Sequence, residues 1–72
     1  MRQYTVILEW DPGIPAYAAI VPALPGCSSH GRTVADALAN AEEAVVLHLE
    51  CLKNKGEPIP DDVQTATVSV AV

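Results

Sequence analysis

Aromatic and basic residues are scarce in this chain. Of its 72 residues only two Tyr and one Trp are aromatic, and four Lys or Arg stand against nine Asp or Glu, for a formal net charge of −5. Val, Leu, Ile and Ala must therefore supply most of the buried area. Nucleic-acid backbones are bound by clustered Lys and Arg, so the charge argues against direct nucleic-acid binding and favours a basic protein partner.

Long apolar runs are also absent. No run approaches the roughly 20 residues that span a bilayer, and no basic start precedes an apolar signal segment, so we expect a cytoplasmic protein that does not enter the membrane. The two cysteines, Cys27 and Cys51, are expected to be free thiols. No internal repeat or linker divides the chain, which indicates a single domain over residues 1–72.

Three short strands are predicted in the first half of the chain. Apolar residues alternate with mostly polar ones over residues 4–10, the period of a strand with one buried face. Pro and Gly in residues 11–15 predict a turn, after which residues 16–21 return as a second strand. Two prolines interrupt the pattern at 22–26, and residues 27–30 are predicted to form a short third strand.

A helix and a last strand are predicted in the second half. Thr33 followed by Asp36 resembles a capping box, so a helix is expected from about Val34 to Lys53, ended by Gly56. Alternation over residues 66–72 predicts a fourth strand. The expected fold is α+β with order βββαβ, in which one long helix covers a mostly antiparallel sheet. The helix residues expected to face the sheet are Val34, Leu38, Ala41, Val45, Leu49 and Leu52.

Several segments together resemble the HicB family of antitoxins. The most specific is the P-x-L-P-G-C segment at residues 22–27, which is followed by G-R-T at residues 31–33 and by an Ala-rich helix with E-E-A at residues 42–44. The sequence G-E-P-I-P at residues 56–60 completes the match. The resemblance covers nearly the whole chain. Arg32 departs from it, because the family often has Asp there.

The resemblance implies a partial ribonuclease H-like fold and a binding role without a cofactor. HicB-like proteins bind and block a small HicA-type mRNA interferase, so a HicA-like toxin is the implied partner. Many members also carry a C-terminal DNA-binding domain, whereas this sequence stops at Val72 after the last predicted strand. DNA binding by this chain is therefore not expected. The alternative is a stand-alone oligomeric regulatory or small-ligand-binding protein of the same fold.

Three sets of residues have the chemistry of an active or metal site. Cys27 and His30 could form a nucleophile and base, but on a strand they would point to opposite faces. Cys27 and His30 with His48 and Cys51 have the ligand types of a zinc site. Glu9 and Asp11 could bind magnesium for nuclease activity, although such acids beside a turn are usually solvated. We expect no catalytic site and no bound metal, and the zinc set stays open.

Self-association is expected because so short a chain has a small core. A dimer, which could pair further into a tetramer, is the simplest closed assembly. Two surfaces compete for the contact. The favoured one is the strand edge at Cys27, Ser28, Ser29 and His30, which could pair with its symmetry mate. The other is the helix flank at Val46 and Leu47, where the helix is apolar nearly all round.

Overall fold

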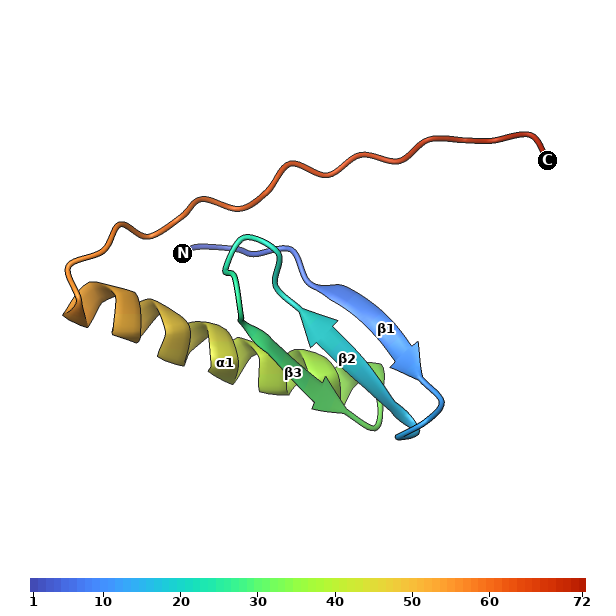
Figure 1. The fold of residues 1–72 in the computed structure, drawn as a ribbon, viewed down its shortest axis with the longest axis horizontal. Helices are drawn as coiled ribbons and strands as arrows, with labels where there is room; N and C mark the ends of the chain where they lie inside the picture. Colours follow the sequence, from blue (N-terminus) through green and yellow to red (C-terminus); the bar gives the residue numbers. More distant parts are fainter.

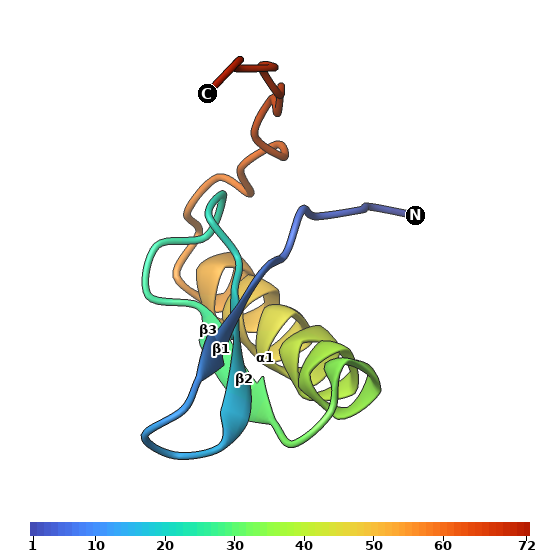
Figure 2. The same cartoon turned by 90° about the vertical axis from the view of Figure 1, so that its right-hand side faces the viewer.

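The computed structural model describes residues 1–72 as a three-stranded sheet covered on one face by one helix (Figure 1). The elements are β1 (Ile7–Asp11), β2 (Ala16–Ile20), β3 (Ser28–Gly31) and α1 (Val34–Asn54). The strands are antiparallel neighbours in the order β1-β2-β3, so β1 and β3 are both edge strands. The two layers are clear in the perpendicular view (Figure 2). The first three strands and the helix of the predicted fold are confirmed.

Turn chemistry joins the strands as the sequence predicts. The backbone N–H of Gly13 donates to Oδ1 of Asp11 at 2.9 Å, which closes the β1–β2 turn. In the β2–β3 connection the N–H of Leu24 donates to the Val21 carbonyl and that of Cys27 donates to the Leu24 carbonyl. These bonds satisfy the backbone of a segment whose Leu24 side chain is fully buried. Gly26 has φ of 81°, a left-handed conformation that glycine adopts without strain.

The helix begins and ends at the expected signals. Thr33 is the N-cap, and its Oγ1 accepts a hydrogen bond from the N–H of Asp36 at 3.1 Å. At the other end, the N–H of Lys55 donates to the Cys51 carbonyl and Gly56 takes a left-handed φ of 71°. The helix is not long and apolar enough to cross a membrane.

The core consists of two small clusters between the sheet and α1. In the first, Ala19 of β2 packs against Ala37 and Ala41 of α1, and all three are fully buried. Because these side chains are single methyl groups, the first half of the helix lies close to the sheet. In the second, Val21, Leu24 and Cys27 pack against Val45 and Leu49 in the second half of the helix.

The predicted fourth strand is not formed. Residues 57–72 have no regular secondary structure. Hydrogen bonds hold this segment only at its start, where the Tyr4 hydroxyl donates to the Pro60 carbonyl at 2.6 Å and Asp62 accepts two bonds from Thr5. Residues 63–72, which we call the C-terminal arm, then run away from the sheet (Figures 1 and 2). Alternation gives a segment two unlike faces, but a strand forms only where another strand accepts its hydrogen bonds.

The helix face toward the sheet also differs from the prediction. Val34 and Leu38, expected to be buried, are 40% and 42% exposed, whereas Ala37 and Ala41 are the buried helix residues. The buried stripe is therefore rotated toward the small side chains. With no fourth strand in the sheet, the flank of the helix that carries Leu38 stays partly exposed.

Gly31 allows the close approach of α1 to β3. A Cβ at this position would overlap the backbone N of Ala37 and lie 2.7 Å from Ala37 Cα. Neither backbone atom can move without shifting the helix start. We expect Gly31→Ala to lower the free energy of unfolding by about 2 kcal/mol or more, as overpacking does. Thermal unfolding followed by circular dichroism measures this. Gly13→Ala is the control, because a Cβ there meets only the Asp11 side chain at 3.2 Å. Equal stability of the two variants would contradict the close approach.

The two hydrogen bonds from Thr5 to Asp62, which tether residues 57–62 to the N-terminal segment, are sensitive to pH. Hydrogen bonds from the backbone N–H and the hydroxyl of Thr5 lower the pKa of the Asp62 carboxyl below its ordinary value of 3.8. A lowered pKa means that the tether is complete above pH 3.8 and is lost as the pH falls through the folded-state pKa. We expect the carboxyl ¹³C shift of Asp62 to titrate below pH 3.8 and that midpoint to rise in Thr5→Val. An unchanged midpoint in that variant would argue against the side-chain bond.

Candidate functional site

The Cys27–His30 segment does not form a catalytic pair in the structure. Cys27 is buried with 5% of its surface exposed, in the cluster with Val21 and Leu24. Burial raises the pKa of its thiol, which keeps the sulfur protonated and weakly nucleophilic. His30 is exposed on β3, and no hydrogen bond joins it to the cysteine. The structure therefore gives this segment a packing role at Cys27.

The candidate metal ligands are not gathered either. No three His, Cys, Asp or Glu side chains lie close enough together to hold a metal ion. Cys27, His30, His48 and Cys51 thus do not form the four-ligand set of a zinc site. Neither Glu9 nor Asp11 belongs to such a group, and Asp11 instead accepts the hydrogen bond of the β1–β2 turn.

The edge of β3 offers a short stretch of backbone. Ser28 and His30 are exposed and Ser29 is half-buried. The Asn40 side chain of α1 donates through Nδ2 to the His30 carbonyl at 2.8 Å, so one acceptor of this edge already has a partner. Pairing of two copies through residues 28–30 stays a prediction, with fewer free backbone groups than the sequence alone indicates.

The outer face of α1 carries a shallow hollow that we call the helix hollow. Val46 and Leu47, which are 50% and 66% exposed, line one end of it, and Glu42 and Glu43 lie one helical turn before them. Ala39 completes the lining. Exposed apolar side chains next to charged ones are common in protein–protein contacts. The predicted exposure of Val46 and Leu47 is confirmed.

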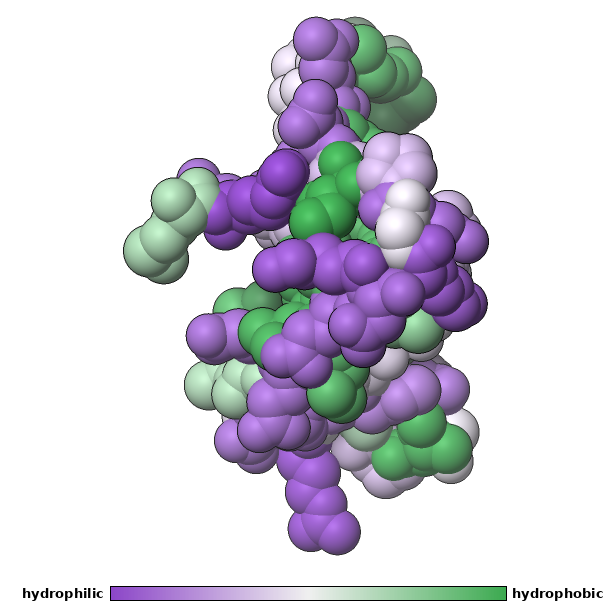
Figure 3. All heavy atoms as spheres, turned by 90° about the vertical axis from the view of Figure 1, so that its left-hand side faces the viewer, coloured by the Kyte–Doolittle hydropathy of each residue, from purple (hydrophilic) through white to green (hydrophobic).

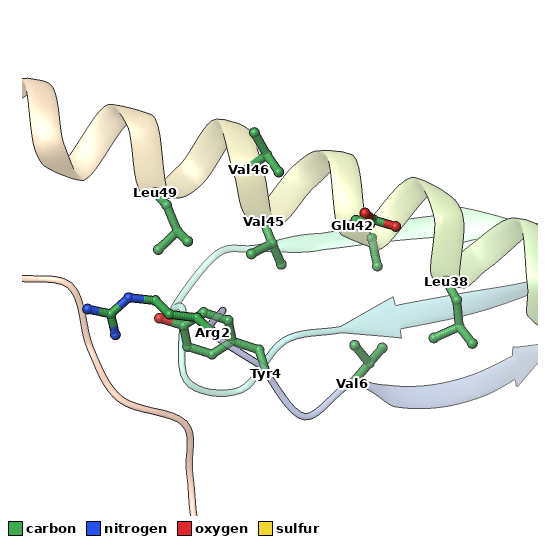
Figure 4. Close-up of a pocket in the computed structure, with 9 residues that line it drawn as sticks. Arg2, Tyr4, Val6, Leu38, Glu42, Val45, Val46 and Leu49 are labelled. Carbon is green, nitrogen blue, oxygen red and sulfur yellow. The ribbon is translucent and has the colours of Figure 1, made fainter.

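A second depression lies between α1 and the N-terminal segment. Figure 4 shows Leu38, Val45 and Leu49 pointing from the helix toward Tyr4 and Val6. Arg2 and Glu42 are the charged residues of this groove, which has a volume of about 470 Å³ and which we call the β1–α1 groove. Seen from the left-hand side of Figure 1, the surface shows hydrophobic residues lying between hydrophilic ones (Figure 3). Its full lining is Arg2, Tyr4, Val6, Leu38, Ala41, Glu42, Val45, Val46 and Leu49.

The sequence did not predict this groove. Leu38, Ala41, Val45 and Leu49 were expected to face the sheet, and the position of the fourth strand in that sheet cannot be derived from alternation alone. The feature of the sequence that could have indicated an uncovered groove was the width of the apolar face of the helix. It extends beyond what three short strands can bury, and surplus apolar surface on a small domain usually has a partner.

The chain matches a family model described as "HicB_like antitoxin of bacterial toxin-antitoxin system" over residues 4–71. Two relatives are UPF0150 proteins. Ta0767 of Thermoplasma acidophilum is 45% identical over 60 residues, which cover 83% of this chain and 86% of the relative. Protein ssr1765 of Synechocystis is 39% identical over 72 residues, which cover 96% and 87% of the two chains.

Two solved structures share the fold. The first is a HicA3 and HicB3 toxin–antitoxin complex, in which the similar chain has a TM-score of 0.67 and 35% identity. The match covers 79% of this chain and 64% of that chain, so this chain spans a little under two thirds of its length. The second is the N-terminal domain of the Burkholderia pseudomallei antitoxin HicB, with a TM-score of 0.65, 34% identity and coverage of 89% and 69%.

The contrast in burial between the two cysteines predicts different reactivity. Cys51 is exposed on α1, whereas Cys27 is buried with a raised thiol pKa. We expect a thiol reagent at neutral pH to modify Cys51 at least about ten times faster than Cys27 in the folded protein. The absorbance of the released reagent group measures both rates. Cys51→Ser should abolish the fast phase and Cys27→Ser should preserve it. A fast phase that survives in Cys51→Ser would contradict the burial of Cys27.

Proposed function

Because the chain belongs to the HicB-like antitoxin family of bacterial toxin–antitoxin systems, we propose that it binds and inhibits a HicA-like toxin, an mRNA interferase. The observation that carries the proposal is the similarity to a chain of a HicA3 and HicB3 toxin–antitoxin complex, at 35% identity. Such a role requires a binding surface and no catalysis by this chain. The toxin acts on mRNA, so the complex is expected in the cytoplasm.

The charge of the chain supports this type of partner. A ribonuclease needs a basic surface to hold its RNA. An inhibitor with a net charge of −5 is attracted to such a surface, which speeds association and orients the two proteins. By covering the basic surface, the antitoxin would exclude RNA without contacting the reacting atoms.

The helix hollow is the surface that we assign to the toxin. The exposed pair Val46 and Leu47 can be buried by a partner, and the carboxylates of Glu42 and Glu43, one helical turn away, can receive its basic side chains. Leu47 is the most exposed large apolar side chain of α1, at 66%. Burial of such a residue at the centre of an interface usually contributes more than the charged rim.

The proposal predicts that Leu47→Glu weakens toxin binding. A carboxylate placed in the buried centre of the contact loses its hydration without a partner. We expect the dissociation constant for a HicA-like protein encoded beside the gene to rise by roughly ten-fold or more, which corresponds to about 1.4 kcal/mol. Calorimetry measures the affinity, and cleavage of a test RNA by the toxin measures inhibition.

Ile14→Glu is the matched control. Ile14 is 55% exposed in the β1–β2 turn, so this substitution adds the same charge to another exposed apolar position. It should leave affinity and inhibition close to those of the unaltered chain. If the unaltered chain neither binds the HicA-like protein nor reduces its ribonuclease activity, the proposed function is wrong. If Ile14→Glu and Leu47→Glu behave alike, the toxin uses another surface.

A further inference from the structure

The C-terminal arm leaves apolar side chains in water. Val68 and Val70 are 87% and 71% exposed, and Val72 is fully exposed. Every second residue from Ala66 to Val72 is apolar, and no side chain from residue 63 to 72 carries a charge. No residue from 64 to 72 makes a hydrogen bond. An uncharged, alternating, unpaired segment of this kind readily pairs with a strand edge.

The same chain has an uncovered place that fits a strand. β1 is an edge strand, so every second residue along it turns its N–H and C=O away from β2. The β1–α1 groove lies along the helix side of the N-terminal segment that leads into β1 (Figure 4). A strand added beside β1 and the residues 4–6 that precede it would place alternate side chains over Leu38, Val45 and Val6. Leu38 is 42% exposed and the other two are half-buried, so each has surface left to cover.

The size of the chain in isolation also indicates missing contacts. Its accessible surface is 5523 Å², whereas a compact monomer of 7.6 kDa exposes about 4300 Å². The surplus of about 1200 Å² exceeds the roughly 800 Å² that each partner buries in a standard interface. The radius of gyration is 14.0 Å, against about 11 Å for a compact domain of this length. The projecting arm makes the chain this extended.

We propose that residues 63–72 of one copy form the fourth strand of a second copy, in a two-fold dimer that exchanges both arms. Each arm pairs with the β1 edge of the other copy, and Ala66, Val68 and Val70 cover its β1–α1 groove. The exchange explains why apolar residues alternate along residues 66–72 as in a strand, although the single chain forms no strand there. It also completes the sheet and helix cover that the sequence predicts.

A second copy fits better than an unrelated partner because the arm and the groove are on the same chain. A different protein seated in the groove would leave the arm exposed, whereas two copies cover both arms and both grooves at once. Pro58 and Pro60 keep the link extended, and Asp62 holds it beside Thr5 of its own chain, from where the arm runs away from the sheet. The absence of charged side chains lets the arm enter an apolar groove without stripping water from a charge.

Light scattering at micromolar concentration tests the dimer. We expect about 15 kDa for the unaltered chain, twice its 7.6 kDa. Val68→Glu with Val70→Glu charges the groove face of the arm and should raise the dimer dissociation constant by roughly ten-fold or more. Thr67→Glu with Ser69→Glu is the matched control, because it adds the same charges to the opposite face of the same strand. A monomeric mass for the unaltered chain, or equal effects of the two double variants, would overturn the proposal.

Isotope labelling distinguishes exchange from a strand that folds back on its own chain. A sample refolded from equal amounts of ¹³C-labelled and unlabelled protein contains mixed dimers. Isotope-filtered contacts between the Val68 or Val70 methyl groups and the Tyr4 ring should then appear between copies. If such contacts occur only within one copy, or only after a HicA-like protein is added, the arm belongs to its own sheet or to the toxin and the exchange is wrong.

The dimer and the proposed toxin contact are separable. Leu47 lines the helix hollow and not the β1–α1 groove. Leu47→Glu should therefore keep the mass of the unaltered chain while toxin affinity falls. Loss of the dimer in Leu47→Glu would place the self-contact on the outer helix face and overturn the arm exchange.

Discussion

The close approach of α1 to the sheet is the constraint on which the rest of the structure depends. Ala19, Ala37 and Ala41 meet there with almost no exposed surface, and Gly31 leaves no room for a Cβ against the helix backbone. Single methyl groups at the crossing point bring two backbones nearer than branched side chains would. Close packing of small side chains therefore fixes the first half of the helix on the sheet, although this contact buries little apolar area.

Because the contact between the three alanines buries little area, the rest of the chain must supply most of the apolar burial. The larger aliphatic residues lie along the second half and the flank of α1, where the small cluster of Val21, Leu24 and Cys27 and the N-terminal segment face them. Val45 and Leu49 are half-buried, and Val46 and Leu47 are exposed. The chain has only three aromatic residues, so few large side chains are available to cover the exposed aliphatic surface of α1. The uncovered area falls on two sides of one helix, as the helix hollow and the β1–α1 groove.

Most of the local structure could be predicted because its causes are local. Thr33 and Gly56 determine the helix ends, so the predicted range 34–53 differs from the observed Val34–Asn54 by one residue. Proline and glycine mark the turns, and the three predicted strands overlap the observed ones. The exposed pair Val46 and Leu47 followed from helical periodicity. The β1–α1 groove and the free arm could not be derived this way, because they depend on which edge accepts the last alternating segment. Such pairing depends on where the rest of the molecule leaves an open strand edge, and not on the segment alone.

The two uncovered surfaces share a boundary. Glu42 and Val46 line both the helix hollow and the β1–α1 groove, so one ridge of α1 separates them. An arm seated in the groove would contact this ridge from one side, and a toxin in the hollow would contact it from the other. Self-association and toxin binding would then both restrict the Val46 side chain, and ordering by the first event lowers the entropy cost of the second. A dimer with exchanged arms would therefore present a more rigid surface to the toxin than a single chain would.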